Sequence, residues 1–213
     1  MLIRNFAPSQ FKVLYMKKLV SIVTIAVLAI SSLTFSGCAK GEEDPFFSIH
    51  TRDARLTQAW NMVSMTGTVV TTVDGLTTNV EYEFDGTNLY ITTDGVTESF
   101  AYIFNMEVKD NGELFSEEFL NNTVTGATIA QSSKTSYWYW GDDNQSKTSV
   151  NLDLTGVLAA WLNYDLPRLA YNDMIMSVDY ADNYTVYDPV SETYSAASES
   201  VLLEVKFDVD LTQ

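Results

Sequence analysis

Cysteine and histidine are almost missing from this chain, which has one of each among 213 residues. A single cysteine cannot close an intramolecular disulfide or build a cysteine-rich metal site. A serine–histidine–aspartate triad would have to use His50, the sole histidine. We therefore expect a domain that is stabilised by its hydrophobic core, with no metal, no cofactor and no enzymatic activity.

Basic residues are also scarce, with 12 Lys and Arg against 28 Asp and Glu and a formal net charge of −16. Binding to nucleic acid, or to an anionic membrane by charge, needs a basic surface, so we expect neither. A strongly acidic protein stays soluble because its copies repel one another. We expect a monomer.

A long hydrophobic run is missing as well. The apolar segment Leu19–Ile30 has 12 residues, whereas a membrane-spanning helix needs about 20. It follows Lys17 and Lys18 and precedes the small residues Ser36 and Gly37. This order of basic, apolar and small residues is typical of a secretory signal peptide, so we expect residues 1–37 to be removed.

The sole cysteine, Cys38, directly follows this segment. A general secretory signal does not require cysteine there, and residues 35–38 (Phe-Ser-Gly-Cys) resemble the lipobox of bacterial lipoproteins. The resemblance implies a diacylglycerol on the Cys38 thiol and a further acyl chain on its new amino terminus, since one chain alone anchors only weakly. The alternative is a free cysteine beside a cleaved secretory signal.

Two flanking segments extend this interpretation. Residues 1–15 precede Met16, a natural start, and either lie upstream of the true start or lengthen the basic segment. Residues 38–48 form an acidic tether in which Ala39 carries no signal for inner-membrane retention, so we expect an anchor in the outer membrane. Residues 42–44 (Glu-Glu-Asp) resemble the acidic tag of surface-exported lipoproteins. The alternative is a solvated linker that an anionic membrane repels.

Residues 49–213 have the pattern of an all-β domain. Apolar and polar residues alternate in 80–85, 100–109 and 201–211, and Asp-Gly pairs or similar turn residues separate closely spaced strands. About eight or nine strands are predicted, within the range of an antiparallel up-and-down barrel or a sandwich. Pairing of the last strand with the first, near Trp60, would close the sheet and remove both edges.

Four local expectations complete this pattern. We expect a short helical turn over 49–56 with Ser48 as its cap, and a strand over 123–128. Pro167 is predicted to form the turn between strands 161–166 and 174–180. Residues 181–200, acidic and rich in tyrosine, are predicted to form a mobile loop at the rim.

The chain resembles the lipocalin-like bacterial lipoproteins in three stretches. These are Arg55–Trp60 behind a helical turn, the aromatic run Tyr137–Trp140 followed by a polar loop and a strand, and the hairpin that begins at Trp161. The resemblance implies a ligand-binding barrel and assigns Trp60 to the closure of the barrel base. The alternative for Trp60 is an ordinary core tryptophan.

Aromatic residues are the candidates for ligand contact. Alternation points one set inward, where it would line a cavity for a small hydrophobic or amphipathic ligand: Tyr82, Phe100, Tyr102 and Phe104. Trp138 and Trp140 either form a stacking platform for a sugar or an apolar ligand or belong to the core.

Two functions remain open at this level. The first is a lipid-anchored barrel that binds a small molecule at the cell envelope. The second is a surface structural or adhesion module without internal ligand, which contacts protein or glycan through Tyr184, Tyr187 and Tyr194. Residues 142–144 and 182–183 offer oxygen atoms to Ca²⁺, but they lack the spacing of a calcium loop, so we expect solvated acidic loops.

Overall fold

The computed structural model describes residues 50–141, 147–188 and 192–210, so the predicted signal peptide, Cys38 and the predicted tether lie outside the described residues. Within these ranges, no helix is long and apolar enough to cross a membrane. The elements are α2 (Arg52–Leu56), β1 (Ala59–Val73), β2 (Leu76–Phe84), β3 (Asn88–Thr93), β4 (Val96–Val108), β5 (Glu113–Asn122), β6 (Thr128–Trp140), β7 (Ser149–Leu152), η1 (Gly156–Ala160), β8 (Asn163–Leu169), β9 (Asp173–Asp188) and β10 (Thr193–Val209).

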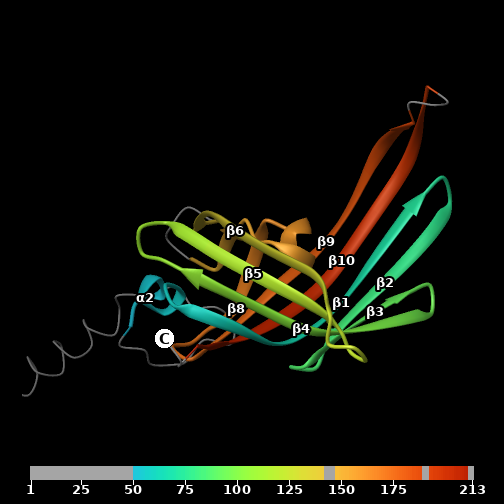
Figure 1. Ribbon diagram of the computed structural model, residues 1–213. Helices are drawn as coiled ribbons and strands as arrows, with labels where there is room; N and C mark the ends of the chain where they lie inside the picture. The colour runs from blue at the N-terminus through green and yellow to red at the C-terminus, as the bar shows by residue number, and fades with distance from the viewer. Residues whose placement is uncertain (1–49, 142–146, 189–191, 211–213) are drawn as a thin grey trace, which may run out of the picture. The chain divides into compact units, whose positions relative to one another are not determined.

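The ten strands form one closed antiparallel barrel in which sequence neighbours are also neighbours in the sheet. The first strand pairs with the last from Trp60 opposite Val209 to Val73 opposite Ala197, as the long final strand predicted. The expected up-and-down architecture is therefore confirmed, with ten strands in place of eight or nine (Figure 1).

The two ends of the barrel differ in how the wall closes. At the end near α2, β1 pairs directly with β4, and Trp60 lies opposite Met106. Toward the other end, the β2–β3 hairpin lies between β1 and β4. Figure 1 shows the β1–β2 and β9–β10 hairpins extending away from α2. We call the end near α2 the core end and the opposite end, toward which these hairpins extend, the open end.

The wall on the other side of the barrel thins toward the open end. β6 pairs with β7 only over residues 138–140, and β9 pairs with β8 only as far as Ser177. Beyond these points β6 and β9 are edges of an otherwise continuous sheet. The short 3-10 turn η1 lies in the connection between β7 and β8.

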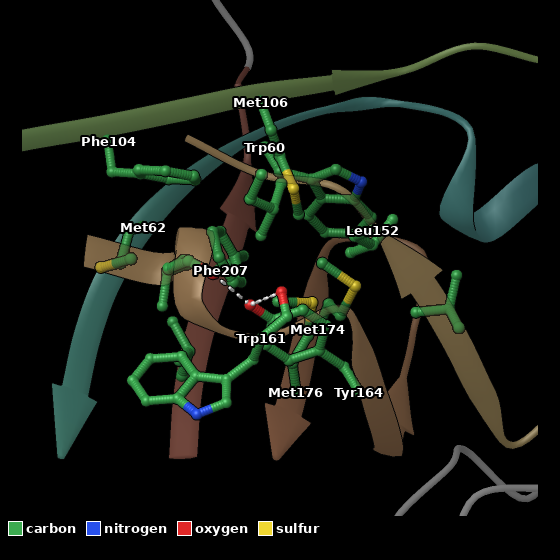
Figure 2. Packing of buried hydrophobic residues seen from close by; sticks show 14 of the residues in the cluster. Trp60, Met62, Phe104, Met106, Leu152, Trp161, Tyr164, Met174, Met176 and Phe207 are labelled. Carbon is green, nitrogen blue, oxygen red and sulfur yellow. Dashed lines mark hydrogen bonds between the residues drawn. The ribbon is translucent and has the colours of Figure 1, made fainter. Parts of the chain in front are cut away.

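Side chains fill the interior of the core end. Trp60, Phe104, Met106 and Phe207 are all at most 2% exposed, and the rings of Phe104 and Phe207 meet edge to face at 6.2 Å. Figure 2 shows these residues converging from β1, β4 and β10 onto methionines of β9. This packing supplies the apolar burial that a domain without a disulfide needs.

α2 is fastened to the base of the core end. Thr51 is its N-cap, accepting a hydrogen bond from the Ala54 N–H at 3.1 Å, in place of the predicted cap Ser48, which lies outside the described residues. The Trp60 indole N–H donates to the Leu56 carbonyl at 2.9 Å. This bond joins the end of α2 to the start of β1.

Two of the local expectations were wrong for identifiable reasons. Residues 123–127 form a turn and not a strand, because the Asn122 side chain accepts hydrogen bonds from the N–H groups of Val124 and Thr125. Pro167 lies inside β8 and not at a turn. The register with β9 shifts between Asp165 and Arg168, and a bulge tolerates the missing proline N–H.

The largest correction concerns residues 181–200, which are predicted as a loop. Residues 181–188 and 193–200 form the outer half of the β9–β10 hairpin, paired from Ala181 opposite Ser200 to Asp188 opposite Thr193, whereas residues 189–191 lie outside the described residues. Both faces of this ribbon are largely exposed, so no buried face imposes the alternation from which strands are recognised. Tyr187 and Tyr194 face each other across it, with ring centroids 5.0 Å apart.

Candidate functional site

A carboxylate lies inside the barrel. The alternation of β5 turns Leu114, Ser116 and Glu118 inward, and Glu118 is only 5% exposed. It lies opposite Phe104 of β4 and Ser132 of β6. On β5, Glu118 is the last buried inward residue, because the next one, Leu120, is partly exposed.

The two oxygen atoms of Glu118 have unequal surroundings. Oε1 accepts from the Tyr102 hydroxyl at 3.0 Å and from the Val157 N–H at 2.8 Å. Oε2 has the Ser132 hydroxyl at 3.5 Å, which is the limit of a useful hydrogen bond. No ion pair joins Glu118 to a cation among the described residues. The structure therefore holds a buried carboxyl group with one weakly satisfied oxygen.

The segment that covers Glu118 is held at several points. The Thr155 N–H donates to the Ser116 hydroxyl at 3.1 Å, and the Tyr164 hydroxyl donates to the Leu158 carbonyl at 2.9 Å. Between them Gly156 adopts φ +66° and lies directly against the Glu118 carboxyl group. A side chain at this position would collide with the carboxylate, so glycine is required here.

Burial changes the acidity of the phenols around this carboxylate. Desolvation raises the pKa of Tyr102 well above its usual value, and the charge of Glu118 and their hydrogen bond raise it further. Burial likewise raises the pKa of Tyr164. Both phenols therefore keep their protons and act as hydrogen-bond donors at neutral pH.

The inner face continues beyond Glu118 as a partly exposed apolar wall. Tyr82 and Phe100, two of the residues predicted to contact a ligand, are on this wall and remain partly accessible. Val69, Ile91 and Leu120 share it and pack against the core. Their surface would contact the apolar part of a molecule that reaches Glu118 from the open end.

The other inward-predicted aromatic residues lie deeper. Tyr102 and Phe104 are buried, and Tyr102 meets Phe84 edge to face with ring centroids 5.2 Å apart. Tyr102 enters the site through its hydroxyl, whereas Phe104 forms part of the filled core end.

Trp138 and Trp140 lie at the core end, edge to face at 5.8 Å. Their indole N–H groups donate to the Lys109 carbonyl at 2.7 Å and to Asp53 at 2.8 Å. Trp138 lies six residues along β6 from Ser132, or about 20 Å of strand. The two tryptophans therefore do not meet Glu118.

Glu118 and Gly156 were missed from the sequence. The segment 113–120 is ambiguous between helix and strand, and that ambiguity hides which side each residue faces. Taken as a strand, it places Leu114 and Glu118 on one face, a pattern that would have shown a carboxylate pointing into the core.

Metal binding has no evident place in this part of the chain. Across residues 50–141, 147–188 and 192–210, no three His, Cys, Asp or Glu side chains group closely enough to hold an ion.

Comparison with known proteins gives no family: no protein-family model, no curated protein and no solved structure matches this chain. Its function must therefore be argued from its own residues.

Proposed function

We propose that this chain is a lipid-anchored cell-envelope protein whose barrel binds one small amphipathic molecule at its open end, without chemical conversion. The buried Glu118 carboxylate is the observation that carries the proposal. Burying a carboxyl group is unfavourable unless good hydrogen-bond donors surround it, and Oε2 has only the distant Ser132 hydroxyl. A hydroxyl or ammonium group of a ligand would supply the missing donor.

The surroundings of Glu118 define the rest of the ligand. The side chains of Tyr82, Ile91 and Leu120 offer an apolar wall beyond the carboxylate, and the filled core end stops the ligand from passing Phe104. A short molecule with one donor group and one apolar part fits these conditions. The apolar wall would favour it by about 25 cal/mol for each Å² of apolar surface buried.

Replacing Glu118 by glutamine tests this proposal. Glutamine keeps an acceptor for Tyr102 and Val157 but loses the charge, so we expect about 10- to 100-fold weaker binding, the range for a charge-assisted hydrogen bond. Native mass spectrometry of the protein purified from its own host, in detergent, would reveal a bound mass. We expect that mass in the wild-type protein and its loss from Glu118→Gln.

Glu117→Gln is the matched control. Glu117 neighbours Glu118 on β5 but faces outward, where it accepts a hydrogen bond from Asn105 at 3.1 Å. Ligand occupancy should stay at the wild-type level in this variant. Bare wild-type protein in repeated preparations, or equal loss in both variants, would contradict the proposed function.

The anchor is tested separately at Cys38, which we propose carries the lipid. Cys38→Ser should release the protein from the membrane fraction, since no basic surface would hold it there by charge. Fractionation after metabolic labelling with a radioactive fatty acid measures both properties. Label in the Cys38→Ser protein, or its retention in membranes, would show that the attachment lies elsewhere.

A further inference from the structure

One edge of the sheet is left without a partner strand. β9 pairs with β10 along its whole length without a register shift, but β8 accompanies it only as far as Ser177. Among the described residues, no strand pairs with the other side of Asp179–Tyr187. This stretch lies beyond the ligand wall proposed above and is independent of it.

The hydrogen-bonding groups of this edge can be assigned from the pairing. The Val209 N–H donates to the Asn172 carbonyl at 3.0 Å, so even-numbered residues of β9 bond to β10. In an antiparallel ladder the odd-numbered residues then direct their N–H and C=O groups to the opposite side. Of these, the Asn183 N–H donates to the neighbouring Asp182 side chain at 2.8 Å, which is consistent with an edge that has no partner strand.

This edge lacks the usual protection against strand addition. Natural sheets protect long edges with proline, lysine, bulges or a covering segment. Residues 179–187 contain no proline and no lysine, and the pairing with β10 has no bulge. The edge therefore presents a regular row of donors and acceptors for another strand.

A hollow of about 360 Å³ lies where β8 leaves β9. Trp161, Leu162 and Val178 contribute apolar surface to it, and Asp165 and Asp179 contribute carboxylates. Apolar walls with acidic groups suit a lysine or arginine side chain, whose stem is apolar and whose head is cationic. The hollow adjoins the first residues of the free edge, so an added strand could place such a side chain in it.

The charge of the ribbon selects between occupants. Asp182 lies directly opposite Glu199 on the same face, and like charges in this arrangement repel each other. A second copy of this chain would bring the same carboxylates, together with the formal net charge of −16. A basic strand would instead neutralise them.

We propose that the free edge of β9, Asp179–Tyr187, accepts an extended cationic peptide segment of a partner protein as an added β-strand. Backbone hydrogen bonds to the odd-numbered residues hold the segment. A lysine or arginine at its end enters the hollow beside Asp165 and Asp179. This interaction goes beyond the binding of a small molecule at Glu118, and either can exist without the other.

The test uses the full chain in detergent and a fluorescein-labelled ten-residue peptide of alternating lysine with valine or threonine. Fluorescence anisotropy should show binding that weakens as salt is added. Ala181→Pro and Thr185→Pro together remove two edge donors while leaving the bonds to β10 intact, because proline is tolerated on an outer edge. We expect about tenfold weaker binding from the loss of two backbone hydrogen bonds.

A matched proline control lies on β6, whose stretch before Trp138 is also an edge of the sheet. The Trp138 N–H donates to the Gly112 carbonyl at 3.0 Å, so the Ser133 N–H faces away from β5, and Ser133→Pro should leave peptide binding unchanged. Asp165→Asn with Asp179→Asn should weaken binding about tenfold without a backbone change. This pair keeps the test decisive if the proline variants do not fold.

Three results would overturn the proposal. The first is equal peptide affinity of the wild-type protein, the Ala181→Pro/Thr185→Pro variant and the Asp165→Asn/Asp179→Asn variant. The second is undiminished binding of a peptide in which glutamate replaces each lysine. The third is a dimer in sedimentation that Ala181→Pro dissolves, since the occupant would then be a second copy of the chain.

Discussion

Replacing Gly156 by alanine is expected to destabilise the fold by about 3 to 5 kcal/mol, the sum of backbone strain and steric overlap. Gly156 has φ +66°, a conformation that alanine adopts only with strain. An added Cβ would also lie 2.0 Å from the carboxyl carbon of Glu118. Glu118 cannot withdraw without losing its bonds to Tyr102 and Val157. Urea unfolding followed by tryptophan fluorescence measures the loss.

Gly126→Ala separates the two contributions. Gly126 has φ +67°, but nothing lies within 4 Å of the added Cβ, so strain alone should cost about 1 to 2 kcal/mol. Combining Gly156→Ala with Glu118→Ala removes the overlap, and the double variant should recover part of the stability lost by Gly156→Ala alone. Equal losses at Gly126 and Gly156 would mean that contact with Glu118 does not constrain this segment.

Sequence periodicity predicted those parts of the barrel in which one strand face is buried. The alternation of 100–108 and 201–209 follows from the filled core end, and the closure of β1 on β10 follows from the length of the last strand. Where both faces are largely exposed, as in residues 181–187 and 193–200, the sequence carries no clear alternation and the ribbon was missed. The strand expected over 123–128 was wrong because the Asn122 side chain forms a turn after β5.

The candidate site was missed for a related reason. A carboxylate at an inward position contradicts the rule that strands bury apolar residues, and rules of this kind fail most often where function requires an exception. Tyr102, Ser132 and Val157 come from three separate segments, and no local pattern shows that they meet. Only the register of β4, β5 and β6 brings their polar atoms to Glu118.

The boundary between the filled and open halves connects the fold to the proposed functions. Glu118 is the last buried inward residue of β5, so residues that stabilise the core end would also form the floor of the proposed ligand site. The β9 edge lies farther out, where packing no longer decides the sequence. The proposed peptide site therefore lies on a different stretch of the barrel from the proposed ligand site and can be altered separately from it.

Trp60→Ala is expected to cost about 3 to 5 kcal/mol, the range for removing a fully buried tryptophan. Trp60 is fully buried and is paired with Val209 on one side and Met106 on the other. Its indole N–H also fastens Leu56 of α2. Its loss would open a cavity where the first strand meets β10, β4 and α2, and the urea midpoint should fall accordingly.

Two further variants show how much of this effect belongs to barrel closure. Trp60→Phe leaves a smaller ring in the core and removes one of the two donors to the Leu56 carbonyl, the other being the Gln58 N–H, so an intermediate loss of about 1 to 3 kcal/mol is expected. Tyr139→Ala removes an aromatic side chain that is 63% exposed and should change stability by about 0.5 kcal/mol or less. If Trp60→Ala were no more destabilising than Tyr139→Ala, Trp60 would not hold the barrel base. An unchanged urea midpoint in Trp60→Phe would mean that the indole bond to α2 adds nothing beyond packing.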